Sequence, residues 1–240
     1  MKKVKLLVFL TLLFAISTKG WAQESAVSDN PFIKKWELSA YGGWSHTLAK
    51  LSDQIPDDLV DYSKRLRSGY HVGADLDYFW QERFGVGLKY VRFNASEATD
   101  GIAVVDTAGG QTIARGTMSD DIVLHFIAPS FNFRYIFPSS KVSVQAHYAL
   151  GYAAYTNQAV LAGQHIKLTA KSLGISMGAR ITVPVANRLA FMAGASLVGG
   201  SFGQMDIHHA GTVQTIKFEK TEERENFSRL DVSAGLRLRL

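Results

Sequence analysis

Charged side chains recur at alternate positions in several segments of the chain. Asp75 and Asp77 flank a leucine, as do Arg229 and Asp231. Because residues i and i+2 of a β-strand lie on the same face, this spacing gathers acids and bases on one side of a strand. The charged residues that follow the pattern are Glu37, Asp75, Asp77, Lys89, Arg134, Arg180, Arg229 and Asp231.

The chemistry open to this set depends on whether the residues share an interior. In a barrel narrow enough for side chains to fill it, opposite charges would pair, since an unpaired buried charge is costly. We therefore expect ion pairs that plug the interior, and a path for protons or ions is the alternative. Arg237 and Arg239 continue this face near the end of the chain, where we expect water to solvate them.

Histidines are the other residues that could carry chemistry. His125 follows Ser119, Asp120 and Asp121, and a histidine beside a serine or an acid is suited to acyl transfer. An enzyme that trims or transfers lipid acyl chains, with His125 as its base, is therefore one alternative. No distinctive spacing supports it, and the chain has no HExxH, Walker or GxSxG motif.

No other pattern indicates a catalytic, cofactor or metal site. The pair His208-His209 is interpreted as two solvated loop residues rather than metal ligands. The chain contains no cysteine, which excludes disulfides and the Cys-based zinc and redox motifs. We expect no catalytic residue, no cofactor and no metal.

Eight segments with alternating apolar and polar residues would carry the charged set. They are residues 36–47, 70–80, 84–90, 122–137, 142–152, 172–183, 189–197 and 227–240. In the fourth, Leu124 and Phe126 are apolar at even positions, whereas Phe131 and Phe133 are apolar at odd ones. This change of phase predicts a β-bulge near residues 126–129, where Pro129 would be tolerated.

Short and long connections alternate along the chain. Tight turns follow Trp80, Phe137 and Val183, whereas residues 50–69, 95–121, 157–167 and 202–225 form long loops. This is typical of a transmembrane barrel, whose short turns face the periplasm and whose long loops face outward. We expect a short helix in the first loop and hairpins at residues 101–118 and 206–218.

The first 22 residues have the features of a secretory signal. Lys2, Lys3 and Lys5 precede an apolar run over residues 6–16, and Gly20-Trp21-Ala22 offers a cleavage site. The run is too short for a spanning helix. Of the 26 Lys and Arg residues, four lie in this segment, which leaves 22 against 21 Asp and Glu. The near-neutral remainder gives no support to a nucleic-acid partner.

Aromatic residues gather near both ends of the strands, as in the girdles at membrane interfaces. The predicted periplasmic band contains Trp36, Tyr78, Trp80, Phe84, Tyr135 and Phe137. The predicted outer band contains Trp44, Tyr90, Phe93, Tyr152, Tyr155, Phe202 and Phe227.

The end of the chain resembles the signal that outer-membrane barrels present to the barrel insertion machinery. Its residues are Ser233, Gly235, Leu238 and Leu240, with leucine where phenylalanine is the more usual last residue. Over residues 36–240 the layout resembles the small eight-stranded barrels of the OmpX, OmpW and OmpA-transmembrane type. That resemblance implies an outer-membrane protein. The likeness to the OmpW type in particular implies a small passage for apolar or ionic solutes.

We therefore predict an all-β fold, an eight-stranded antiparallel up-and-down transmembrane barrel. Residues 1–22 would be a cleaved signal peptide, 23–35 a periplasmic segment and 36–240 the barrel, in the outer membrane of a Gram-negative bacterium. The expected function is a structural or surface-interaction role through extracellular loops. A porin-like channel and a lipid-modifying enzyme are the alternatives. Expected partners are outer-membrane lipid, the insertion machinery and an unknown extracellular ligand, but no nucleic acid.

Overall fold

The computed structural model describes residues 35–49, 59–105, 113–219 and 224–240. All elements of secondary structure in these ranges belong to the compact unit formed by residues 34–240. The predicted signal peptide and nearly all of the predicted periplasmic segment lie outside the described residues, so these two assignments stay predictions.

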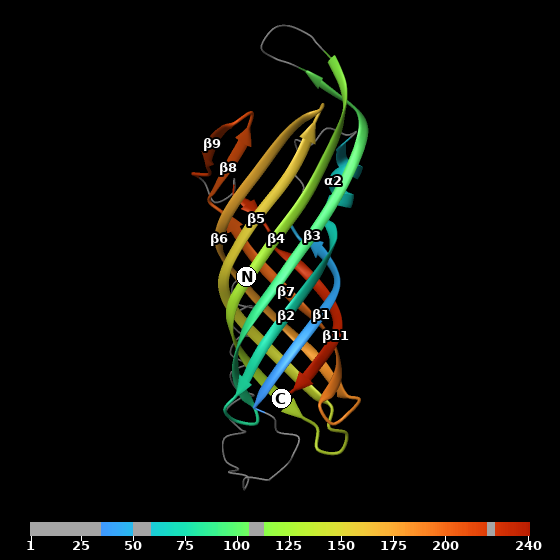
Figure 1. Ribbon diagram of the computed structural model, residues 1–240, viewed down its shortest axis with the longest axis vertical. Helices are drawn as coiled ribbons and strands as arrows, with labels where there is room; N and C mark the ends of the chain where they lie inside the picture. The colour runs from blue at the N-terminus through green and yellow to red at the C-terminus, as the bar shows by residue number, and fades with distance from the viewer. Residues whose placement is uncertain (1–34, 50–58, 106–112, 220–223) are drawn as a thin grey trace, which may run out of the picture. The chain divides into compact units, whose positions relative to one another are not determined.

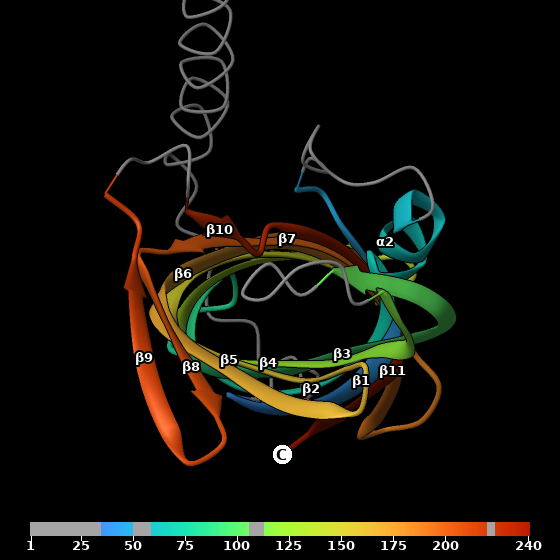
Figure 2. The ribbon, with the colours of Figure 1, turned by 90° about the horizontal axis from the view of Figure 1, so that it is seen from above.

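Eight antiparallel strands close into a ring (Figures 1 and 2). The strands of the ring are β1 (Trp36–Thr47), β2 (Ser68–Phe79), β3 (Phe84–Val105), β4 (Ile113–Ile136), β5 (Ser143–Leu161), β6 (Gln164–Pro184), β7 (Leu189–Phe202) and β11 (Arg229–Arg239). Each pairs with its neighbours in chain order, and the pairing of β1 with β11, from Glu37↔Arg239 to Thr47↔Arg229, closes the barrel. The predicted fold is confirmed.

The alternation of residue types sets which face each side chain takes. Glu37, Arg134 and Arg237 are at most 1% exposed, whereas Leu150 and Leu173 are 61% and 69% exposed. Charged groups therefore lie inside and apolar groups outside, the reverse of a soluble protein. Such a surface is stable only against lipid, and a closed barrel leaves no unpaired strand edge there. No helix in the described ranges is long and apolar enough to cross a membrane.

Beyond the apolar belt, four strands of the ring continue for several residues, so β3–β6 are longer than predicted. The hairpin expected at residues 101–118 is the outer end of β3 and β4, with a register shift between Thr99 and Ile102. It adds no strand to the ring.

The expected hairpin near the end of the chain is a separate one. It consists of β8 (Gln204–His209) and β9 (Thr212–Lys217), turns at Ala210 and Gly211, and pairs with β6. In Figure 2 it stands outside the ring. The short strand β10 (Glu225–Asn226) pairs with the end of β7. The helix expected in the first loop is α2 (Val60–Leu66).

The bulge predicted in the fourth strand is wrong. The register of β4 against β5 is the same at Ile127↔Tyr152 and at Ser130↔Ala149, and no shift separates them. Leu124 and Phe126 are buried on the same inward face as Asn132. The phase change in the sequence marks a change in the chemistry of the interior, from polar to apolar, and not a change of face.

The outer aromatic band is also partly wrong. Phe93, Phe202 and Phe227 are 5%, 0% and 8% exposed and lie inside the barrel, with Tyr155 packed against them. Trp44, Tyr90 and Tyr152 do face outward, at 38–49% exposure. Residues an even number of positions apart in a strand lie on the same face. Phe93 therefore shares the inward face of Lys89, and Phe227 shares the inward face of Arg229. The periplasmic band faces outward as expected, with the ring centroids of Trp36 and Tyr78 4.8 Å apart.

Candidate functional site

The interior of the barrel is the first candidate site, and all eight predicted residues lie in it. Nearest the short turns, Glu37 accepts hydrogen bonds from Arg134 at 2.6 Å and Arg237 at 3.0 Å. Arg239 lies 3.6 Å from the same carboxylate. Arg237 and Arg239 are 0% and 4% exposed, so the expectation that water solvates them is wrong. They are buried because closure of the barrel sets β11 beside β1.

Asp75 and Asp77 form the next layer. Asp75 contacts Arg180 at 2.7 Å and Lys89 at 3.3 Å, and it accepts a hydrogen bond from Tyr41 at 2.9 Å. Arg180 also lies 3.9 Å from Asp77. Further donors to Asp77 are Asn132 at 3.0 Å and Gln145 at 3.2 Å.

A third group lies nearer the long loops. Arg229 donates to Asp231 at 2.9 Å, and Ser45 donates to the same carboxylate at 2.6 Å. Ser45 also contacts Nδ1 of His71 at 2.8 Å. The eight predicted residues therefore form three separate groups, around Glu37, around Asp75 and Asp77, and around Asp231.

These groups leave little open volume between them. The cavity lined by Tyr41, Lys89, His147 and Arg180 measures about 20 Å³, which is room for roughly one water. The buried acids are held by several donors each, as opposite charges in a low-dielectric interior require. This arrangement fits a plugged interior better than a continuous aqueous path.

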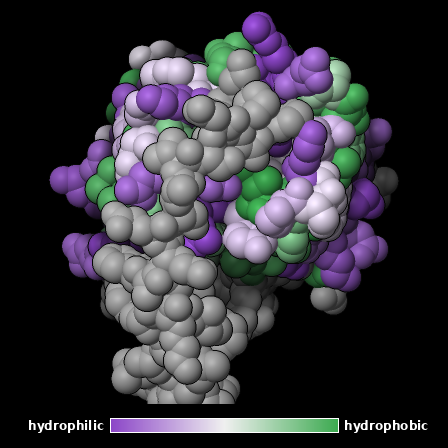
Figure 3. Space-filling model, turned by 90° about the horizontal axis from the view of Figure 1, so that it is seen from below, coloured by the Kyte–Doolittle hydropathy of each residue, from purple (hydrophilic) through white to green (hydrophobic). Residues whose placement is uncertain are grey.

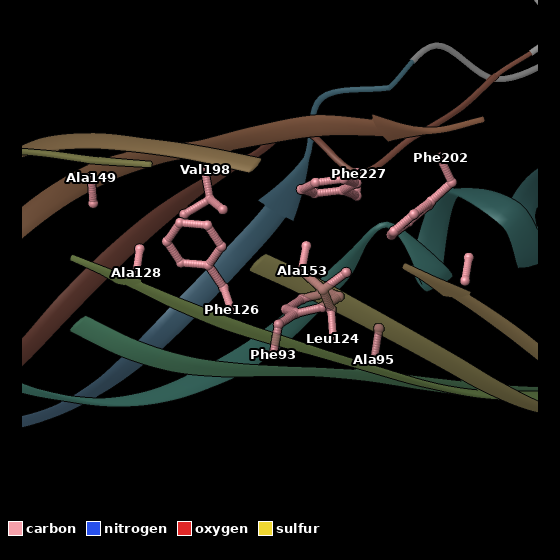
Figure 4. Packing of buried hydrophobic residues seen from close by; sticks show 11 residues of the cluster. Phe93, Ala95, Leu124, Phe126, Ala128, Ala149, Ala153, Val198, Phe202 and Phe227 are labelled. Atoms are coloured by element: carbon pink, nitrogen blue, oxygen red, sulfur yellow. The ribbon is translucent and has the colours of Figure 1, made fainter. Parts of the chain in front are cut away.

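Above the charged groups lies an apolar layer that the sequence prediction missed (Figure 4). Phe202 lies 4.7 Å from Phe227 and 5.5 Å from Tyr155, measured between ring centroids. A Cβ at Gly200 would collide with the Phe227 ring, so only glycine leaves room for it. The layer is completed by Phe93, Ala95, Leu124, Phe126, Ala128, Ala149, Ala153, Ala170 and Val198.

Helix α2 lies beside the outer end of β3. Its Tyr62 is 3% exposed and donates to Asp120, which also accepts a hydrogen bond from Asn157. Arg65 contacts Glu97 of β3 at 2.7 Å. Burial raises the pKa of the Tyr62 hydroxyl above its usual value, and the hydrogen bond to Asp120 raises it further. Two ring strands, β3 and β4, thus hold α2 directly, and Asn157 of β5 binds the same Asp120 carboxylate.

The arrangement around His125 does not assemble a catalytic group. His125 faces outward, with its Nδ1 2.8 Å from the Tyr90 hydroxyl. Asp120 faces inward and is bound by Tyr62 and Asn157. His208 and His209 are adjacent in β8, so they face opposite sides; His208 contacts Thr169, and His209 contacts the backbone of His165. The described residues contain no cluster of three metal-ligating side chains.

A second candidate site is the part of the sheet that continues past the apolar belt. We define the outer sheet as residues 154–161 of β5, residues 164–172 of β6, and the hairpin β8–β9. Lys167 of β6 pairs with His208 of β8, which pairs with Val213 of β9. The basic residues of the outward face are His165, Lys167, Lys171, His208 and Lys217. Its one acid, Asp206, accepts a hydrogen bond from Thr215 at 2.6 Å.

The opposite end of the barrel carries the short turns. In Figure 3, hydrophilic residues lie at several places around the visible part of this end, among hydrophobic ones. The last strand ends here: Leu238 and Leu240 are 37% and 51% exposed on the outward face, whereas Ser233 and Gly235 lie on the inward one. That these four residues form an insertion signal stays a prediction.

Comparisons with known proteins give a structural likeness only. A major outer membrane protein from Thermus thermophilus is similar with a TM-score of 0.56 and 12% identity, over 87% of this chain and 100% of that one. Neisserial surface protein A, NspA, has a TM-score of 0.43 and 14% identity, over 85% and 97%.

Ail, the attachment invasion locus protein of Yersinia pestis, solved in complex with the heparin analogue sucrose octasulfate, has a TM-score of 0.42 and 12% identity, over 85% and 99%. No family model and no curated protein matches the chain. The likeness to the Thermus protein shows the fold, and the chain is an outer-membrane β-barrel in fold, with its apolar belt facing lipid.

Proposed function

We propose that this protein is a closed barrel of the outer membrane of a Gram-negative bacterium that binds an anionic partner at the cell surface through its outer sheet. The observation that carries the proposal is the outer sheet itself. It extends past the belt as regular paired strands, and its outward face gathers basic side chains around a single acid. Residues 1–22 would serve as the cleaved signal, and residues 23–35 would remain in the periplasm.

The charge of this face supports a polyanion as the partner. Lys167, Lys171 and Lys217 are exposed, and His165 and His208 add further donors. Asp206 offsets one of the three lysine charges, so the face keeps a net positive charge. Several cations on one rigid surface attract a chain of regularly spaced negative groups, such as a sulfated or phosphorylated polysaccharide.

The interior argues against the channel alternative. Glu37 joins β1 to β4 and β11 through three arginines, and Asp75 joins β2 to β3 and β6. Above these pairs the apolar layer narrows the lumen to a cavity of about 80 Å³. A solute would have to break buried ion pairs and separate packed rings to cross.

The test of binding uses heparin as the probe and the purified protein in nanodiscs of uncharged lipid. We expect binding that weakens steeply with added salt and falls about 10-fold or more in the variant Lys167→Gln, Lys171→Gln, Lys217→Gln. The matched control, Lys35→Gln, Arg83→Gln, Arg188→Gln, removes the same charge at the other end and should bind as the wild type does. Equal loss in both variants, or no binding by the wild type, would refute the proposal.

A planar bilayer tests the channel alternative separately. We expect the protein to add no conductance above that of the empty bilayer. Discrete conductance steps would instead favour a passage for ions through the barrel.

We also propose that the protein is not an enzyme. The outward position of His125, away from Asp120, supports this view. Release of fatty acid from lipid A by cells that express the protein, but not by cells that express His125→Ala, would contradict it.

A further inference from the structure

A cavity opens inside the barrel at its outer mouth. It measures about 80 Å³ and is bounded by residues of β1, β3, β4, β5, β7 and β11, by α2 and by β10. Its walls are mainly apolar, and the rings of Phe93, Phe202 and Phe227 point toward a shared interior space (Figure 4). Leu66 of α2, Ile122 and Leu124 of β4 and Tyr155 of β5 complete the apolar side.

A buried guanidinium also lines this cavity. Arg229 is 1% exposed, and its Nε donates to Asp231. Its Nη1 and Nη2 have no hydrogen-bond partner among the described residues. The Phe93 ring lies 5.0 Å from the guanidinium carbon and offers only its π face. Two unsatisfied donor groups at a buried site are costly, so they indicate a missing acceptor.

The two nitrogens define which acceptor fits. The Nη1 and Nη2 groups form a planar fork that matches the two oxygens of a carboxylate. The apolar rings above this fork suit a hydrocarbon group. A space of about 80 Å³ is roughly half of the apolar cavity of about 150 Å³ that holds benzene, so a ligand with as many heavy atoms as benzene fits only with part of it extending into the open mouth.

We propose that the mouth cavity binds a short-chain carboxylate of about three or four carbons. The carboxylate accepts from Nη1 and Nη2 of Arg229, while Asp231 keeps its bond to Nε. The alkyl chain lies among the rings of Phe93, Phe202 and Phe227. This site lies inside the mouth and uses none of the basic residues of the outer sheet. Failure of one proposal would therefore leave the other unaffected.

Glu225 is the one acid among the described residues that line the cavity. A negative charge there repels a bound carboxylate, so Glu225→Gln is expected to strengthen butyrate binding. The matched control is Arg83→Gln, which removes an exposed arginine at the opposite end of the barrel and should leave butyrate binding unchanged.

The experiment measures butyrate binding to the folded protein in nanodiscs by calorimetry or ligand-observed NMR. We expect butyrate to bind at least about 10-fold more tightly than 1-butanol, which has the same chain without the charge. Arg229→Gln, which keeps amide donors but loses the charged fork, should weaken butyrate binding about 10-fold or more. Ile122→Phe, which fills the cavity from its rim, should do the same.

Each arm can overturn the proposal. Absence of butyrate binding up to about 10 mM would mean that the cavity holds water only, and equal binding of 1-butanol would exclude recognition of the charge. If folded Arg229→Gln bound butyrate as tightly as the wild type, the guanidinium of Arg229 would not be part of the binding site. Migration on an unboiled gel shows whether that variant folds. If it does not fold, the proposal is still tested by the comparison of butyrate with 1-butanol in the wild type and by the binding of butyrate to Ile122→Phe.

Discussion

Single residues of the interior act through the partners that the ring brings to them. Glu37 is the clearest case, because one carboxylate faces three buried arginines that come from β4 and β11. Neutralising it leaves cations without a counter-charge, and breaking a buried pair on one side typically costs about 3–5 kcal/mol.

We therefore predict that Glu37→Gln lowers the urea concentration at which the barrel unfolds in lipid vesicles. The free energy of unfolding should fall by about 3–5 kcal/mol, as measured from the fraction that migrates as folded without boiling. Glu82→Gln, at an exposed position in the first short turn, serves as the control and should be neutral. Similar midpoints for the two variants would contradict the assigned role of Glu37.

A second residue-scale prediction concerns Tyr62 and pH. Its pKa is raised in the folded state, so the protonated hydroxyl is favoured there. The stability it contributes is complete below the ordinary tyrosine pKa of about 10 and is lost as the pH rises above that value. We expect α2 to remain protected from trypsin at pH 8 and to lose protection at higher pH.

The variant Tyr62→Phe isolates this effect. It removes the hydrogen bond to Asp120, so α2 should be cleaved at Lys64 or Arg65 faster than in the wild type already at pH 8. Its cleavage should lack the rise that the wild type shows above about pH 10, once the pH dependence of trypsin is corrected with a peptide substrate. If cleavage of both proteins rose in the same way with pH, the rise would come from a titratable group other than Tyr62.

At the scale of elements, the outward face of each strand is defined by lipid. Leu236 lies within β11, three residues before its end, where it pairs with Ala40, and it is 51% exposed. Leu240 lies at the end of the strand beside the short turns. Depth in the bilayer should therefore separate the two positions.

We predict that Leu236→Arg lowers the free energy of unfolding in vesicles by about 2–4 kcal/mol, whereas Leu240→Arg costs about 0–1 kcal/mol. The measurement is again urea unfolding. If both substitutions lowered the free energy of unfolding by the same small amount, this face of β11 would not contact acyl chains.

The end of β11 carries a further prediction about assembly. If Ser233, Gly235, Leu238 and Leu240 are read by the insertion machinery, removal of Leu240 should reduce the amount of folded barrel in cells. The stability of barrel refolded in vitro should change little, because Leu240 lies at the rim. The two readouts are the folded fraction in outer-membrane extracts and the unfolding midpoint of the refolded protein. A lower unfolding midpoint with an unchanged folded fraction in cells would contradict the assignment of these residues as an insertion signal.

At the scale of the whole molecule, the layered interior sets the behaviour of the barrel. Ion pairs lie toward the short turns, an apolar layer lies toward the mouth, and the outer sheet continues beyond. We expect the purified protein to migrate faster unboiled than boiled on a denaturing gel, and to require detergent or lipid to stay in solution. A processed chain that is monomeric in detergent-free buffer would contradict the membrane barrel.

Much of this architecture could be predicted from the sequence because strand alternation is a local property. The period of two assigned Glu37, Asp75 and Asp231 to the inward face from their neighbours alone, and it located all eight strands of the ring. The same rule, carried further along each strand, would have placed Phe93 and Phe227 inside. Aromatic type favours the outer band for these two residues, but the alternation along the strand decides which face they take.

Other features depend on pairs that only the closed ring creates. The contact of Glu37 with Arg237 joins the two ends of the barrel, and local patterning holds no information about that distance. The docking of Tyr62 on Asp120 and the cavity above Arg229 arise in the same way, from segments far apart in the chain. Alternation along a strand therefore determined which way each side chain points, whereas strand register and closure decided which side chains meet, because those depend on the pairing of every strand around the ring.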